Sequence, residues 1–289
     1  MLFGHLDYSV LIGANGTKLS THLVAGGTEL GGAFALLGME NAELSWGIAL
    51  SRPVRRSRRK SVTLQAGLDV SNSKQRLMGA TSSEDRIRKL SVGLSIDKTD
   101  KRGRNFFSFG LEQGLGSSLG GMENGSPLSS RSFSGADGRF TKLTADLTRV
   151  QRISPRVSLI GRVAGQYSMR PLVAGEQWSI GGADSVRGHP QSSLLGDGGF
   201  TAGLEARIAP LSDKLEGVQL ALFADHGVVT TKKPGVGQKD RRGISGVGLG
   251  VRANLAEDLA LRGDLAWSLG ADPISGGTPT AYLQLTKSF

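Results

Sequence analysis

The sequence predicts an all-β fold, a transmembrane antiparallel β-barrel. Three observations predict it: long stretches of alternating apolar and polar residues, a persistently polar second face, and a last strand that ends in an aromatic residue. Successive side chains of a strand point to opposite faces, so alternation indicates a strand with one apolar face.

The alternation is strongest over residues 62–71, 90–97 and 259–269. Many of the predicted strands approach the 9–11 residues of a tilted membrane-spanning strand. We expect about fourteen strands, over residues 5–13, 17–26, 43–52, 61–71, 86–98, 104–114, 139–152, 155–168, 175–181, 198–209, 217–229, 243–254, 258–269 and 280–289.

The second face of these strands carries mainly Gly, Ser, Thr, Arg, Asp and Gln. A soluble sandwich of this size would have shorter strands and a more apolar inner face. Because buried unpaired polar groups are costly, such a face indicates a wet lumen and not a packed core.

Composition excludes several other classes. The chain has 289 residues, no cysteine and a formal net charge of +10, and only 38% of its residues are hydrophobic. The longest apolar candidate, residues 31–39, is far shorter than the 18–20 residues of a spanning helix. Without cysteine there are no disulfides, iron–sulfur clusters or thiol catalysis. The start of the chain lacks a signal peptide, since it has no basic region and its apolar stretch contains His5 and Asp7. We therefore expect a cytoplasmic protein or a chain without its natural N-terminus.

The basic character of the chain invites a nucleic-acid interpretation, but the charges are spread along it and no nucleic-acid motif accompanies them. We expect no nucleic-acid partner. One dense basic run is interpreted as a solvated loop or a turn near lipid head groups, with a phosphate-binding patch as the alternative. It consists of Arg55, Arg56, Arg58, Arg59 and Lys60.

Enzymatic motifs are missing from the sequence. The four histidines are scattered without metal-ligand spacing. No G-x-S-x-G elbow occurs, and the glycines of residues 246–250 lie in a strand pattern without a following helix. We expect no catalysis, no metal and no cofactor.

The alternation stops at residues 181–199, where we predict a long loop between two spanning strands. Loops of more than about 12–15 residues are often functional. Gly181–Gly182 and Gly198–Gly199 would permit sharp turns at its two ends. Arg187 and Asp197 are its conspicuous charges, with Asp184 near its start.

This loop resembles a known family. Val186-Arg187-Gly188-His189 is similar to the Val-Arg-Gly-aromatic motif of the Omp85 superfamily, although His189 stands where Tyr or Phe is usual. Nearly the whole chain resembles, in order, the two-partner secretion transporters (TpsB) of the FhaC and ShlB type. The segments that carry this likeness are residues 50–53, 138–143, 176–182, 185–188, 196–199, 205–207 and 223–227, with Gln166.

The resemblance implies a sixteen-stranded barrel in the outer membrane of a Gram-negative bacterium, with the motif loop between strands eleven and twelve. Nine predicted strands precede the loop and five follow it, so the chain is expected to lack the first two strands. It would also lack the signal peptide and the POTRA modules. The implied activity is secretion of a partner exoprotein of the haemolysin or adhesin type without ATP. The terminal Phe289 resembles the signal read by the barrel assembly machinery.

The resemblance also implies that the motif loop, residues 181–199, folds into the barrel lumen. Its arginine would there contact an inner-wall aspartate, which by position is Asp225. Alternation independently places Phe223 and Asp225 on the polar face of one strand and Glu205 on the polar face of its neighbour. A guanidinium can bond a carboxylate in bidentate fashion. We therefore predict that Arg187 latches the loop to the wall.

Three alternatives stay open. An assembly factor that inserts other barrels shares related forms of the motif. The second alternative is a diffusion porin, against which the arginine loop with its two inward carboxylates argues. The third is a basic soluble β-protein that binds nucleic acid, against which the lipid-type alternation and the terminal Phe289 argue. Gln166, the approach at 176–182 and the segment 138–143 favour secretion.

Overall fold

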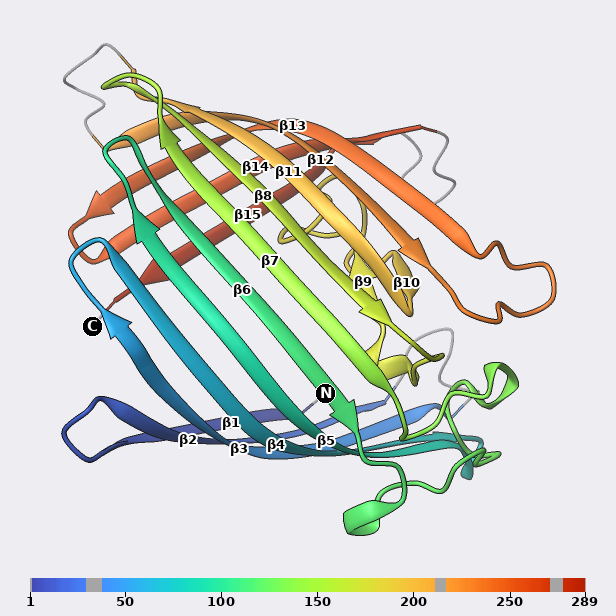
Figure 1. Cartoon of the computed structure of the whole chain (residues 1–289). Helices are drawn as coiled ribbons and strands as arrows, with labels where there is room; N and C mark the ends of the chain where they lie inside the picture. Colours follow the sequence, from blue (N-terminus) through green and yellow to red (C-terminus); the bar gives the residue numbers. More distant parts are fainter. Residues whose placement is uncertain (1, 30–37, 211–216, 271–277, 289) are drawn as a thin grey trace.

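The computed structural model describes residues 2–29, 38–210, 217–270 and 278–288. Thirteen antiparallel strands form one continuous curved wall, in the order β1 to β8 and then β11 to β15. The two remaining strands, β9 and β10, form a small separate sheet on the inner side of the wall (Figure 1). The predicted all-β barrel fold is confirmed.

The wall strands differ greatly in length. The longest are β4 and β5, which run for 18 and 20 residues. The wall consists of β1 (Leu2–Ile12), β2 (Thr17–Glu29), β3 (Glu40–Arg56), β4 (Lys60–Leu77), β5 (Ala80–Thr99), β6 (Gly103–Gly114), β7 (Thr141–Arg152), β8 (Val157–Ser168), β11 (Gly198–Ile208), β12 (Val218–Thr230), β13 (Arg241–Ala256), β14 (Leu259–Leu269) and β15 (Thr280–Lys287).

One predicted wall strand is wrong. Of residues 175–181, only Trp178–Ile180 form a strand, β9, and it pairs with β10 (Leu194–Gly196) instead of joining the wall. A short 3-10 helix over Ala174–Glu176 precedes β9, and it turns the Glu176 carboxylate toward two lysines of the wall. Eight wall strands therefore precede the long connection, not nine.

The two faces of the wall differ as the alternation predicts. Leu204 on β11 and Leu222 on β12 lie on the outer face and are 52% and 55% exposed. Glu205 and Asp225 lie on the inner face of the same strands and are buried. Large exposed apolar surfaces indicate contact with lipid or with another protein, and here they cover the outer face of the wall.

The wall has two unlike ends. One end, named here the short-turn end, carries the tight connections 13–16, 57–59, 100–102, 153–156 and 257–258. The opposite long-loop end carries the connections 115–140, 169–197 and 231–240. β4 and β5 extend into the long-loop end, where Arg88 donates a hydrogen bond of 3.1 Å to the carbonyl oxygen of Leu119.

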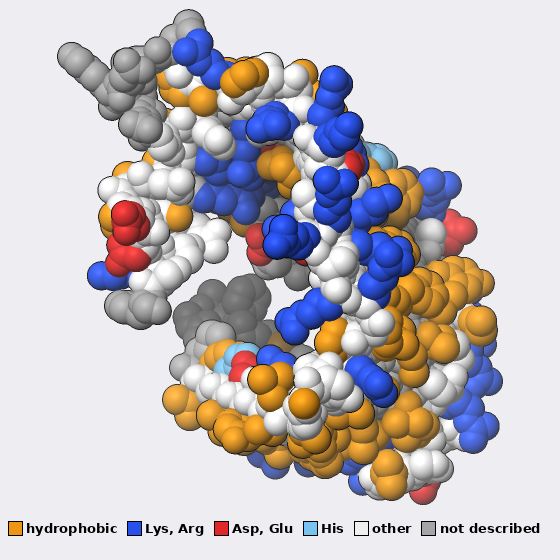
Figure 2. Space-filling model, turned by 60° about the vertical axis from the view of Figure 1, so that its left-hand side comes forward, with side chains coloured by type: hydrophobic (Ala, Val, Ile, Leu, Met, Phe, Trp, Pro, Cys, Tyr) orange, Lys and Arg blue, Asp and Glu red, His pale blue; other side chains and the backbone are white. Residues whose placement is uncertain are grey.

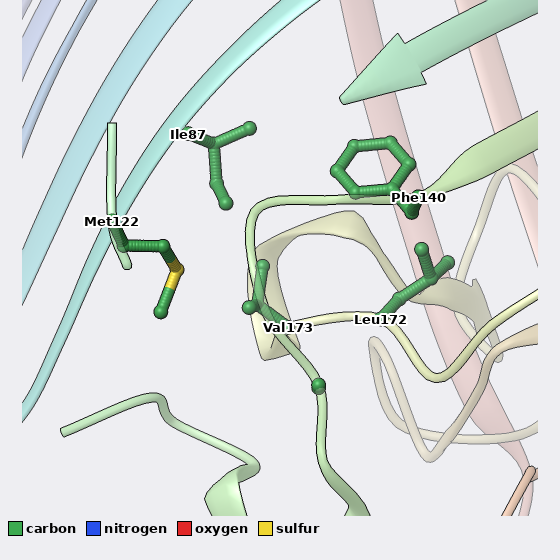
Figure 3. Packing of buried hydrophobic residues seen from close by; sticks show 6 residues of the cluster. Ile87, Met122, Phe140, Leu172 and Val173 are labelled. Atoms are coloured by element: carbon green, nitrogen blue, oxygen red, sulfur yellow. The ribbon is translucent and has the colours of Figure 1, made fainter. Parts of the chain in front are cut away.

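The loops of the long-loop end share a small apolar core with the inner side of β5 (Figure 3). Phe140, Met122 and Leu172 are at most 1% exposed. The full cluster is Ile87, Met122, Ala136, Phe140, Leu172 and Val173. These loops are thus packed together, and the 115–140 loop rests against the connection that carries the motif.

Among the described residues, β1 and β15 do not pair with each other, so the wall is open between them. Phe289, the predicted barrel signal, lies outside the described residues. No helix in the described part of the chain is both long enough and apolar enough to cross a membrane.

Candidate functional site

The connection 169–197 folds back from the long-loop end into the space that the wall encloses. The predicted motif therefore lies in the lumen. Gly181 and Gly182 have φ values of 107° and 101°, a region that residues with a side chain rarely adopt. The amide of Gly181 donates a hydrogen bond of 2.8 Å to the hydroxyl of Ser185, which tightens the turn. Val186 is 0% exposed and Arg187 is 6% exposed, so the tip of the loop is buried.

The guanidinium of Arg187 meets two wall carboxylates. Its Nε and Nη2 donate to the two carboxylate oxygens of Asp225 over 2.7 and 3.0 Å. Its Nη1 donates to Glu205 Oε2 over 2.8 Å. The Phe223 ring lies under the guanidinium, with 3.3 Å between Cζ and the ring centroid. Burial alone would lower the pKa of Arg187, but the hydrogen bonds that it donates to Asp225 and Glu205, and their negative charges, raise the pKa above its usual value. The arginine therefore stays charged.

Sequence reasoning missed a third carboxylate. Asp264 on β14 is 3.7 Å from Arg187 Nη1, and Arg252 on β13 links it to Glu205 through contacts of 2.7 and 2.9 Å. Alternation does place Asp264 on the polar face of its strand. Its level relative to Asp225 depends on the register of two intervening strand pairs, which alternation does not determine.

Tyr282 on β15 is a second residue that sequence reasoning missed. Its hydroxyl accepts a hydrogen bond of 3.1 Å from the amide of Gly188 and donates one of 3.0 Å to the carbonyl of His189. The ring of His189 is buried, and its Nε2 donates to the carbonyl oxygen of Ser245 over 2.8 Å. The residue that replaces the usual aromatic therefore makes a polar contact with β13.

Gly188 fits too closely for any side chain. Its φ is 89°, and an added Cβ would lie 2.7 Å from the carbonyl carbon of Trp267 on β14. We expect Gly188→Ala to displace the loop tip, because both the positive φ and the steric overlap oppose docking. Val186 is buried and the chain has no cysteine, so a Val186→Cys background reports displacement through maleimide labelling. Labelling should rise about tenfold or more.

The control for this variant is Gly79→Ala in the β4–β5 turn. Gly79 has a φ of 79° and open space around it. Alanine at this position therefore has the same backbone strain as alanine at position 188, but no steric overlap. Unchanged labelling in Gly188→Ala, or an equal rise in both variants, would contradict the close fit.

Asp197 is buried at a different place from Arg187. There its carboxylate joins the three connections 115–140, 169–197 and 231–240. Its carboxylate binds the guanidinium of Arg131 and accepts amide hydrogen bonds of 2.7 Å from Leu172 and 2.6 Å from Lys232. The predicted turn at Gly198 is wrong: it is the first residue of β11 and has no positive φ. A Cβ there would lie 2.9 Å from the carbonyl oxygen of Gln166, so close packing accounts for this glycine.

A separate ionic cluster fixes the start of the motif connection to the opposite wall. Glu176 contacts Lys89 over 3.0 Å and Lys142 over 2.6 Å, and Glu112 contacts the same two lysines over 2.9 and 3.3 Å. The four residues come from β5, β6, β7 and the 3-10 helix before β9. The motif connection is therefore tied to the inner wall on two sides.

Known structures share this fold. CdiB from Acinetobacter baumannii superposes with a TM-score of 0.72 at 18% identity, over 99% of this chain and 50% of that one. CdiB from Escherichia coli gives 0.70 at 16% identity, over 94% and 50%. BamA from Haemophilus ducreyi lacking POTRA domains 1–3 gives 0.68 at 12% identity, over 98% and 62%. The chain thus spans about half the length of each CdiB chain.

The sequence comparisons are narrower. No curated protein matches the chain. A model of one protein family, described as haemolysin secretion/activation protein ShlB/FhaC/HecB, matches residues 5–253, which include the wall strands up to β13 and the motif loop. With its barrel wall, its inward arginine loop and this match over most of its length, the chain belongs to the ShlB/FhaC/HecB family of haemolysin secretion/activation proteins.

Proposed function

We propose that the chain is the barrel of an outer-membrane translocator that secretes a large partner exoprotein through its lumen. The observation that carries this proposal is the docked motif loop, whose Arg187 is buried against Asp225 and Glu205. The exposed apolar outer face supports a location in the membrane. Family membership supports a secreted exoprotein of the haemolysin or adhesin type as the partner.

In this proposal the Arg187 contacts are a latch that keeps the lumen occupied. A buried arginine without its carboxylates would be costly, so the loop stays docked until something displaces it. A cavity of about 270 Å³ beside the loop is lined by the arginines Arg162, Arg207 and Arg262 as well as by Glu205 and Asp225. Polar groups of this kind offer transient hydrogen bonds to an unfolded chain, and folding of the exoprotein outside would drive export without ATP.

Deleting the gene tests the proposed function. We expect one very large protein to disappear from the culture supernatant, as measured by mass spectrometry, and to return when the gene is restored. A supernatant identical to that of the parent strain would contradict secretion.

The second candidate is a factor that assembles other outer-membrane barrels, which the similarity in fold to BamA favours. The same deletion strain distinguishes it. Loss of several β-barrel proteins from the outer-membrane fraction, with an unchanged supernatant, would identify an assembly factor instead of a transporter.

A further inference from the structure

Three basic residues and one asparagine lie in register across the outside of the wall at the short-turn end. Lys60 on β4 is directly opposite Lys98 on β5. Lys98 is opposite Asn105 on β6, and Asn105 is opposite Arg149 on β7. These four residues, named here the cationic row, therefore lie at one level on four neighbouring strands.

The cationic row lies where the apolar outer surface ends. The next outward-facing level consists of Val62, Ile96, Phe107 and Leu147, which pair with one another in the same strand order. Further levels of the same face expose Val92 and Phe109, at 57% and 40%. Long basic side chains can reach from such a boundary to polar groups beyond it. In the proposed membrane location, this boundary is the level of the lipid head groups.

The turns beyond the row add to its positive charge. Figure 2 brings this end forward and shows Lys and Arg side chains gathered along its rim, beside the hydrophobic outer surface. Two acids lie among them: Asp97 binds Arg104, and Asp100 binds Arg149 over 3.1 Å. The exposed cations of these turns and of the strand ends beside them are Arg55, Arg56, Arg58, Arg59, Lys101, Arg102, Arg152 and Arg156.

The two lysines of the row lack a counter-charge within the described residues. Neither Lys60 nor Lys98 forms an ion pair there, whereas Arg149 has Asp100. Like charges directly opposite each other on neighbouring strands destabilise a sheet. An anion held between the two ammonium groups would reverse this effect.

We propose that Lys60 and Lys98, with the arginines of the adjacent 57–59 turn, bind the phosphate head groups of anionic phospholipids in the leaflet at the short-turn end. Thr99 donates a backbone hydrogen bond of 2.9 Å to the carbonyl of Arg59, which brings that turn against the end of β5. A phospholipid satisfies both parts of the surface at once, because its chains cover the apolar levels while its phosphate meets the row. An acidic polypeptide would meet only the charges. This inference rests on the membrane location in the proposed function.

Lipid binding by the purified chain in detergent tests the proposal. Native mass spectrometry would compare added phosphatidylglycerol with phosphatidylcholine, and polyglutamate would be the competing probe. We expect preferential binding of phosphatidylglycerol. The double variant Lys60→Gln/Lys98→Gln should weaken it about thirtyfold, since each cation near a membrane surface contributes roughly a fivefold factor.

The matched control is Lys239→Gln/Arg241→Gln, which removes the same charge from exposed residues at the long-loop end. It should bind phosphatidylglycerol like the wild type. Equal binding by the row variant and the wild type would overturn the proposal, as would equal weakening in the row and control variants. Displacement of phosphatidylglycerol by polyglutamate would favour an acidic polypeptide instead.

Insertion of the purified chain into vesicles of phosphatidylcholine or of phosphatidylglycerol separates this proposal from the proposed function. Insertion without a preference for phosphatidylglycerol would leave the membrane location intact and refute the head-group site. Failure to insert into vesicles of either lipid would refute both.

Discussion

Replacing Arg187 by alanine is expected to impair secretion while leaving the wall folded, because a loop that is undocked but not withdrawn lies without a fixed position in the path of the exoprotein. The variant leaves Asp225 buried without its bidentate partner, whereas Glu205 keeps Arg207 and Arg252. Breaking a buried ion pair by removing one partner costs about 3–5 kcal/mol. The docked loop should therefore lose its preference over the undocked state by roughly a hundredfold or more.

Two measurements check this expectation. The amount of the exoprotein in the supernatant reports secretion, and maleimide labelling of the Val186→Cys background reports whether the loop is docked. Arg187→Lys keeps the charge but not the planar fork, so it should fall between the wild type and alanine. A folded Arg187→Ala protein that secretes like the wild type would refute the latch.

Arg162→Ala is the matched control for the latch. Arg162 also lines the lumen, but its side chain is 54% exposed and its ion pair with Asp146 spans 3.3 Å. Its Nη1 donates a long, exposed hydrogen bond of 3.5 Å to the loop carbonyl of Asp184. Exposed pairs contribute only about 0–1 kcal/mol. We therefore expect loop labelling to rise by no more than about fivefold in this variant, far less than in Arg187→Ala.

Replacing Asp197 by alanine is expected to open the long-loop end. The change leaves the buried guanidinium of Arg131 without its carboxylate and removes the acceptor of the Leu172 and Lys232 amides. The expected loss is again about 3–5 kcal/mol, because a charge and two donors lose their partner together. Asp197→Asn keeps an acceptor oxygen and should lose less.

Limited trypsin digestion of the folded chain measures this opening. Cleavage after Arg131 should become fast in Asp197→Ala, since that residue is only 7% exposed in the native loop. Asp240→Ala removes an exposed acid from the same end and is expected to leave the digestion pattern unchanged. Resistance of Arg131 in Asp197→Ala would show that the apolar cluster alone holds the loops.

Most of the fold could be predicted because each wall strand has one face toward the polar lumen and one apolar outer face. Polar and apolar residues therefore alternate along the sequence of each strand. The placement of Glu205 and Asp225 follows from that same alternation. The pattern of residues 175–181 predicts a wall strand, but the strand that forms there, Trp178–Ile180, lies inside the lumen, where side chains alternate in the same way. Periodicity identifies a strand but does not say which sheet it joins.

The remaining partners of the loop depend on distances that local sequence does not contain. Asp264 and Tyr282 reach the motif only because the β12–β13, β13–β14 and β14–β15 registers bring their levels together. Asp197 is a conspicuous charge in the sequence, but its role depends on contacts with residues 25 to 66 positions away. Such long-range contacts follow from tertiary packing and leave no local pattern.

The contacts of the motif loop also bear on the shape of the wall. Its arginine reaches β11, β12 and β14, and its next residue is held by Tyr282 on β15. The loop is thus an internal brace that spans the five consecutive strands β11 to β15 and holds them at one curvature. Withdrawal of the brace would empty the lumen and release these strands from that curvature. The lumen would then widen in the same step that clears it.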